Sequence, residues 1–140
     1  MEQNFLEESL RDTLAKFNSE TGTIHRLDES AQLLHLVAQA GLPPQLLEVV
    51  KTIPVGKGIA GEVVAKNRPV TICNLQKDTS GVSQPGAKQT GVGGAICVPV
   101  RLRGKIVGTF GIGTAQEREY SATEINALQD VANSIAGQLA

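Results

Sequence analysis

The stretch GAICVPVRLRGKIVGTFGIG, residues 94–113, decides the fold of this chain. Its two halves, 94–102 and 105–113, are rich in β-branched side chains, and Arg103-Gly104 separates them. Alternating apolar runs around a two-residue turn predict two antiparallel strands joined by a tight hairpin.

Both faces of this predicted hairpin are apolar. A regular turn predicts Ile96 opposite Gly111 and Cys97 opposite Phe110. The apolar side chains then fall into two sets: Ile96, Val98, Val100 and Val107 on one face, and Ala95, Cys97, Phe110 and Ile112 on the other. A sheet with two apolar faces must be covered on both sides. We therefore expect an α/β (α+β) fold, with helices above and below a central antiparallel sheet.

The rest of the chain supplies further strands and the helices that would cover the sheet. The turn formers Asp28-Glu29-Ser30 predict a second hairpin. The expected elements are strands at residues 21–28, 33–39 and 69–73, and helices at residues 3–17, 44–51, 59–66 and 122–139. Residues 76–93, rich in Gly and Pro, are expected to form a long loop.

The two predicted terminal helices each carry one apolar stripe. The stripe residues are Leu6, Leu10, Leu14 and Phe17 in the first helix, and Ile125, Leu128, Ala132, Ile135 and Leu139 in the last. Ser121 and Glu124 form a capping-box signature before the last helix, whose stripe has the spacing of a heptad seam. Two interpretations stay open. The stripes pack on the chain's own sheet, or they form the interface of a homodimer, with Phe17 outside that interface.

The composition is that of an ordinary single domain. The chain has 140 residues, of which 41% are hydrophobic and 19% charged, so we expect one domain over residues 1–140. The net charge of −1 gives no reason to expect nucleic acid or a membrane as a partner. The N-terminus lacks a signal-peptide pattern, and no apolar run approaches the ~20 residues of a membrane span. We therefore expect a cytoplasmic protein.

A glycine motif, Gly56-Lys-Gly-Ile-Ala-Gly61, matches the GxGxxG pattern of dinucleotide-binding folds. Its context argues against a nucleotide site, which needs a parallel strand directly before the glycines. Pro54 interrupts the segment before the motif, and the neighbouring strands are predicted to form antiparallel hairpins. We therefore interpret these glycines as residues that let a loop turn sharply and a helix pack close to the sheet.

Four motifs follow one another along the chain: IPVGKGIAGEVVAKNRPV at residues 53–70, then residues 91–100, 103–109 and 120–124. In this order and spacing they resemble the GAF domain family, over nearly the whole chain. The resemblance implies a GAF/PAS-like sheet of five to six strands, with the terminal helices on one face and short helices plus a long loop on the other.

The resemblance also implies a small-molecule pocket on that second face, beneath the loop at residues 74–92. The candidate pocket residues are Ile72, Asn74, Asp78, Thr90, Val92 and Ile96. The implied partners are an unidentified small molecule, a second copy of the chain and a signalling protein.

No cofactor, metal site or catalytic residue is expected. The Asn-Lys-Phe-Asp-Glu constellation of cyclic-nucleotide-binding members is absent, as is the residue set of bilin-binding members. His25 and His35 fall in predicted strands and are expected to be structural, not haem ligands. The two cysteines cannot hold an iron–sulfur cluster.

The expected function is a small-molecule-sensing or protein-interaction regulatory module in signal transduction, which acts through its terminal helices. One alternative is a free methionine-(R)-sulfoxide reductase, because those enzymes resemble the chain around residues 53–70. Their chemistry needs a thiolate and a resolving cysteine. The resemblance places Ala60 and a cysteine-free loop where those enzymes carry cysteines. Another alternative is a purely structural dimerisation domain with a vestigial pocket. Cys73 and Cys97 are expected to be buried thiols, with a redox pair as the alternative.

Overall fold

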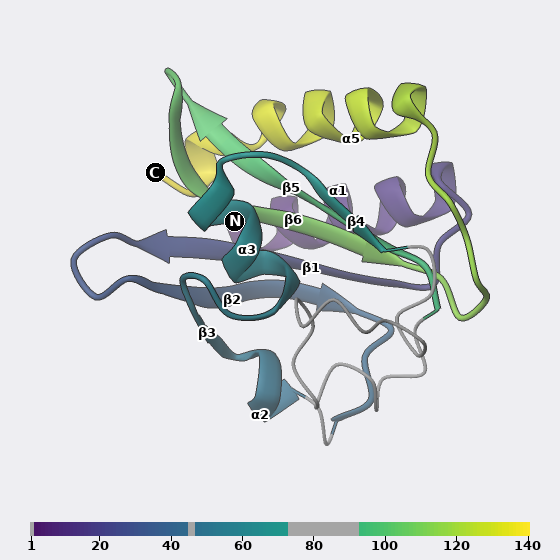
Figure 1. The fold of residues 1–140 in the computed structure, drawn as a ribbon, viewed down its shortest axis with the longest axis horizontal. Coiled ribbons are helices and arrows are strands. Elements are labelled where there is room, and N and C mark those ends of the chain that lie inside the picture. Colours follow the sequence, from purple (N-terminus) through teal and green to yellow (C-terminus); the bar gives the residue numbers. More distant parts are fainter. Residues whose placement is uncertain (1, 45–46, 73–92) are drawn as a thin grey trace.

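The computed structural model describes residues 2–44, 47–72 and 93–140. Its centre is an antiparallel sheet of six strands, shown in Figure 1. The strands are β1 (Thr21–Asp28), β2 (Leu33–Ala40), β3 (Thr52–Pro54), β4 (Val70–Ile72), β5 (Ala95–Leu102) and β6 (Lys105–Gly113). They follow the order β3-β2-β1-β6-β5-β4 across the sheet, so β1 and β6 lie at its middle.

Helices cover both faces of this sheet, as its apolar hairpin predicts. They are α1 (Glu2–Lys16), α2 (Leu47–Val50), α3 (Gly58–Lys66) and α5 (Ala122–Ser134), with a final 3-10 turn η3 (Ala136–Gln138). In Figure 1, α1 and α5 lie on one side of the sheet and α3 lies on the other. The predicted α+β architecture, with terminal helices on one face and short helices on the other, is confirmed.

The segment after β2 differs from the expectation. The sequence predicts one helix over residues 44–51, whereas α2 spans only Leu47–Val50 and a short strand, β3, follows it. β3 pairs with β2, with Ile53 opposite Leu34. A strand of three residues that ends in proline is too short to show the alternation by which strands are recognised.

The β5–β6 hairpin pairs one residue away from the predicted register. Ile96 lies opposite Ile112, and Cys97 lies opposite Gly111. The predicted pairs, Ile96 with Gly111 and Cys97 with Phe110, are therefore wrong.

A β-bulge beside the turn causes this shift. Arg101 pairs with Ile106, but the next residue, Val100, pairs with Gly108. Val107 is therefore an extra residue in β6. One extra residue turns every side chain beyond it to the opposite face.

The bulge moves two large side chains of β6 to the other face of the sheet. The regular hairpin predicts Phe110 and Ile112 on the face of Cys97. Instead, both pack with Ile96 and Val98 in the core beneath α1 and α5. The face beneath α1 and α5 therefore carries the large side chains of β6, and the face of Cys97 lacks them.

The larger core lies between the sheet and the two terminal helices. Leu6, Leu10, Leu14, Phe17, Leu128, Ala132, Ile135 and Leu139 are buried in it, and Ile125 packs against it partly buried. The chain's own sheet therefore covers the stripe residues considered for a dimer interface, so their burial needs no second copy. The homodimer itself stays a prediction.

The last helix begins as predicted and ends earlier. The Ser121 hydroxyl accepts a hydrogen bond from the Glu124 amide at 3.1 Å, and Glu124 Oε1 accepts one from the Ser121 amide at 2.9 Å. This confirms the capping box. The helix was expected to continue to residue 139, but α5 ends at Ser134, and Ile135, with φ −99° and ψ 0°, leads into η3. None of the helices in the described ranges is long and apolar enough to cross a membrane.

Candidate functional site

Small side chains leave a hollow on the sheet face opposite α1 and α5. Residues paired across neighbouring strands project to the same face. Thr23, Gly111 and Cys97 form one such row, and Thr21, Gly113 and Ala95 form the next. Neither row contains a large side chain, because the bulge in β6 turns its large side chains to the other face.

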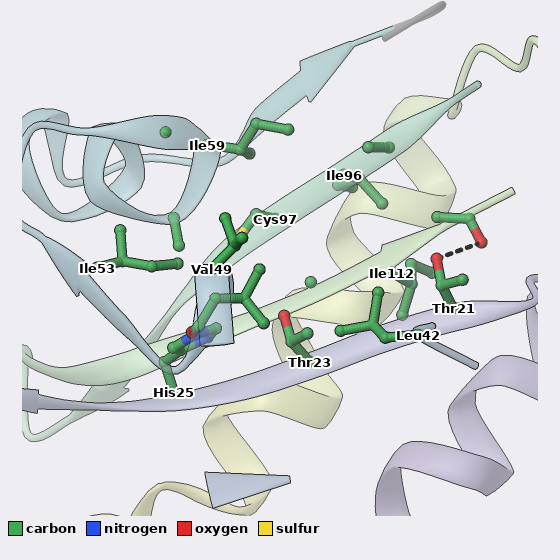
Figure 2. Close-up of a pocket in the computed structure, with 17 residues that line it drawn as sticks. Thr21, Thr23, His25, Leu42, Val49, Ile53, Ile59, Ile96, Cys97 and Ile112 are labelled. Carbon is green, nitrogen blue, oxygen red and sulfur yellow. Dashed lines mark hydrogen bonds between the residues drawn. The ribbon is translucent and has the colours of Figure 1, made fainter. Parts of the chain in front are cut away.

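The segment from α2 through β3 to α3 covers this hollow and leaves a cavity of about 150 Å³. Figure 2 shows Thr23 and His25 projecting from β1 toward the side that carries Ile53 and Ile59. The lining residues are Thr21, Gly22, Thr23, His25, Leu42, Val49, Val50, Ile53, Gly58, Ile59, Ala60, Ala95, Ile96, Cys97, Gly111, Ile112 and Gly113. These described lining residues are mostly apolar, and none of them is Lys, Arg, Asp or Glu.

The glycine motif shapes the cover of the cavity. Gly56 and Gly58 have φ values of +90° and +63°, in the region that favours glycine. A Cβ atom at Gly61 would lie 2.5 Å from the Pro54 carbonyl oxygen, so a side chain there would force α3 away from β3. β3 is antiparallel to β2, so the motif does not follow the parallel strand that a dinucleotide site requires. The predicted structural role of the glycines is confirmed.

His25 brings a hydrogen-bonding imidazole to the cavity. Its side chain is buried, and its Nε2 lies 2.8 Å from the main-chain oxygen of Val50. Because a carbonyl oxygen can only accept, Nε2 carries the hydrogen and Nδ1 keeps a lone pair. No hydrogen-bond partner reaches Nδ1 from the described part of the chain. Burial lowers the pKa of His25 to about 4, against the hydrogen bond to Val50, so the ring is neutral near pH 7.

Cys97 also lines the cavity, but its thiol is not poised to react. It is buried, and burial raises its pKa to about 12. The thiolate, and not the thiol, is the nucleophile and the metal ligand. Cys73 lies outside the described residues, so a pair between the two cysteines stays a hypothesis. Within the described ranges, no group of three or more His, Cys, Asp or Glu side chains could hold a metal ion.

The predicted pocket residues divide into three groups. Ile96 is among the residues that line the cavity, although its side chain packs in the core beneath α1 and α5. Ile72, at the end of β4, is buried but is not among the lining residues. The remaining four, Asn74, Asp78, Thr90 and Val92, lie outside the described residues.

The sequence reasoning missed His25 and the contribution of α2 and β3. A signal for the hollow was present in β6, where Gly111 and Gly113 alternate with a large residue. Two glycines at this spacing leave one face of a strand bare. His25 carried no such signal, because its place in the cavity depends on the pairing of β1 with β6 and on the cover from α2.

Solved structures match the fold over nearly its whole length. The GAF domain of the Acinetobacter phosphoenolpyruvate-protein phosphotransferase has a TM-score of 0.82 at 22% identity, covering 99% of this chain and 82% of that chain. The type II free methionine-R-sulfoxide reductase of Thermoplasma acidophilum has a TM-score of 0.80 at 18% identity, covering 99% and 92%. The GAF domain/HD domain protein of Geobacter sulfurreducens has a TM-score of 0.80 at 13% identity, covering 99% and 91%. At such identities the likeness shows the fold alone.

The comparison with curated proteins gives no match. A family model described as GAF domain matches residues 2–139. The match spans essentially the whole chain, and the antiparallel sheet with helices on both faces agrees with the solved structures. The chain belongs to the GAF domain family.

Proposed function

We propose that this GAF domain is a small-molecule-sensing regulatory module in signal transduction, and that its ligand binds in the cavity beneath α2, β3 and α3. The observation that carries the proposal is the cavity itself, which has about 150 Å³ and mostly apolar walls among the described residues. An apolar pocket with few placed polar groups is the usual form of a small-molecule site.

The same sheet carries the cavity on one face and the terminal helices on the other. Cys97 lines the cavity, and its chain neighbour Val98 belongs to the core beneath α1 and α5. Both α3 and α5 contact β5. A ligand that displaces α3 would therefore shift β5, the strand against which α5 packs. In this proposal the signal leaves through a signalling protein, or a second copy of the chain, that contacts the outer side of α1 and α5.

Non-catalytic sensing also agrees better with the cavity than reductase chemistry does. The Thermoplasma protein of the same fold is a free methionine-R-sulfoxide reductase. A thiol-based reductase needs a thiolate at its pocket. Cys97 has its pKa raised to about 12, and Ala60 stands where the resemblance places a cysteine. Turnover of free methionine-R-sulfoxide that is lost in Cys97→Ser would contradict this part of the proposal.

Native mass spectrometry of the purified protein tests the sensing role. Gly111→Ala places a methyl group in the cavity, with its Cβ 3.5 Å from Cys97 Sγ, an ordinary contact that the fold tolerates. Gly137→Ala is the matched control, because no atom of the described residues lies within 4 Å of a Cβ there. We expect a retained small molecule in the wild type and in Gly137→Ala, and less of it in Gly111→Ala.

The purely structural alternative makes the opposite prediction. The cavity then stays without an occupant, and Gly111→Ala is at least as stable as the wild type because it fills empty space. A wild-type protein that retains no molecule, and that no compound in a small-molecule thermal-shift screen stabilises, would count against sensing and favour a structural role.

A further inference from the structure

Two features of the cavity restrict the chemistry of its ligand: a patch of small residues on the sheet and the hydroxyl of Thr23. We infer that the cavity binds an uncharged molecule about the size of one six-membered ring, which lies on this patch and forms a hydrogen bond with the Thr23 hydroxyl. This inference rests on the proposed function and specifies its ligand.

The patch of small residues lies on β1, β6 and β5. It has two rows, each with one residue from every strand: Thr23, Gly111 and Cys97 in one row, and Thr21, Gly113 and Ala95 in the other. Rows two residues apart along a strand are separated by about 7 Å, and three neighbouring strands span about 10 Å. The patch is therefore large enough for one ring to lie flat on it.

The volume of the cavity sets the size of the ligand. An engineered cavity of about 150 Å³, lined by Leu, Ile and Phe in another protein, stays dry and binds benzene. The cavity described above has about the same volume. Val49, Ile53 and Ile59 lie on the side opposite the sheet. A single ring with a small substituent therefore fits between these aliphatic side chains and the patch.

The lining sets the charge of the ligand. His25 and Cys97 are the only residues of the described lining with a titratable side chain. Burial lowers the pKa of His25 to about 4 and raises that of Cys97 to about 12, so both side chains are neutral near pH 7. A charged group moved from water into such surroundings without a partner is strongly disfavoured. The ligand that fits these walls is therefore uncharged.

The hydroxyl of Thr23 gives the ligand one polar contact. Thr23 lines the cavity and is only partly buried, and Figure 2 shows its oxygen on the side of β1 that faces Val49. The Thr21 hydroxyl in the next row donates to the Gly113 carbonyl at 3.3 Å, whereas no group of the described residues pairs with the hydroxyl of Thr23. A hydroxyl can both donate and accept, so an O–H, N–H or carbonyl group of a ligand can pair with it.

Three probes of similar size test the inference on the whole chain. Phenol has a hydroxyl group, toluene has a methyl group in the same place, and benzoate carries a charge. Calorimetry or ligand-observed NMR gives the affinities, and ¹H–¹⁵N spectra of the protein locate the probes. We expect phenol and toluene to bind and to move the amide resonances of Gly111 and Gly113, while that of Gly137 in η3 stays in place. We expect benzoate to bind more weakly than phenol.

Two matched variants distinguish the Thr23 hydroxyl from the rest of the cavity. Thr23→Val keeps the branched shape of the side chain but removes the hydroxyl, so the ratio of phenol to toluene affinity should fall about fivefold, as expected for one hydrogen bond between neutral groups. Thr21→Val is the control, because it makes the same change in the same strand at a hydroxyl that already donates to the Gly113 carbonyl. It should leave the ratio unchanged.

Several results would overturn the inference. An unchanged affinity ratio in Thr23→Val, or an equal fall in Thr21→Val, rules out the hydrogen bond with Thr23. Tighter binding of benzoate than of phenol rules out an uncharged ligand, and unmoved resonances of Gly111 and Gly113 rule out binding on the patch. Should Thr23→Val fail to fold, Thr23→Ala removes the same hydroxyl and decides in its place. Failure of all three probes overturns this ligand class but not the sensing role, which depends on the retained molecule and on Gly111→Ala.

Discussion

Nε2 of His25 lies 2.8 Å from the main-chain oxygen of Val50, and this hydrogen bond holds the last residue of α2 to the central strand β1. Both residues line the cavity. The imidazole therefore has two distinct nitrogens: Nε2 holds the cover of the cavity, and Nδ1 has no hydrogen-bond partner among the described residues. This arrangement makes the protonation state of His25 important for the whole fold.

Stability should fall with decreasing pH because His25 resists protonation in the folded protein. Burial lowers its pKa from the ordinary 6.5 to about 4. The unfolded chain binds a proton as the pH falls through 6.5, whereas the folded protein does so only near 4. The free energy of unfolding should therefore be about 3 kcal/mol lower near pH 4 than above pH 6.5. Above pH 6.5 the full contribution of the neutral His25 is present. Urea unfolding at pH values between 7.5 and 4 measures the decrease.

His25→Gln distinguishes the pH dependence caused by His25 from that of the other titratable groups. Glutamine does not titrate, so the variant should be less stable at pH 7.5 but lose most of the pH dependence between 6.5 and 4. His35→Gln is the control, because the His35 side chain is 46% exposed and lies 3.8 Å from Asp28, and its charge is only a minor cause of the lowered pKa of His25 beside burial. This variant should keep most of the wild-type pH dependence. If His25→Gln keeps the full slope of the wild type, the assignment to His25 is wrong.

Ser121→Ala should destabilise the start of α5. The substitution removes the hydroxyl that accepts from the Glu124 amide. Loss of such a cap costs about 1 kcal/mol. Ser134→Ala is a matched control at the other end of the helix, because that hydroxyl donates to the Val131 carbonyl and accepts no hydrogen bond from an amide of the first turn. Thermal unfolding by circular dichroism compares the two, and equal losses would contradict the role of the capping box.

Leu128→Ala should destabilise the monomer itself. Leu128 is fully buried in the core between α5 and the sheet. Truncation of a buried leucine costs about 3 kcal/mol. Because the chain's own sheet covers this residue, the loss should not depend on protein concentration in urea unfolding over a hundredfold range. A loss that grows on dilution would instead place Leu128 at a subunit interface.

Arg103→Asn should stabilise the β5–β6 hairpin. Arg103 and Gly104 have φ values of +53° and +81°, and asparagine tolerates this region better than arginine. The expected gain is about 0.5 kcal/mol. Gly104→Ala should have the opposite effect, because a left-handed backbone strains alanine even though no atom in the described part of the chain lies within 4 Å of a Cβ there. Denaturant midpoints test both signs.

The residues that were predicted well are those whose environment is encoded locally. The stripe of Leu6, Leu10 and Leu14 predicts α1 and its buried face, and Ser121 with Glu124 predicts the start of α5. The predicted β5–β6 register was wrong because the bulge at Val107 does not show in the alternation of apolar and small residues along the sequence. The cavity was only partly foreseen, with Ile96 named and His25 missed.

The sequence by itself determined α1, α3, the start of α5, most of the strands and the need to cover a sheet on both faces, because periods of 3.6 and 2 residues are set by neighbours along the chain. Only the tertiary structure decided which face of β6 carries no large side chain. It also decided that the His25 side chain forms a hydrogen bond with Val50 on that face. The physical reason is that a single extra residue reverses every side chain beyond it, and its position is chosen by packing between strands distant in sequence.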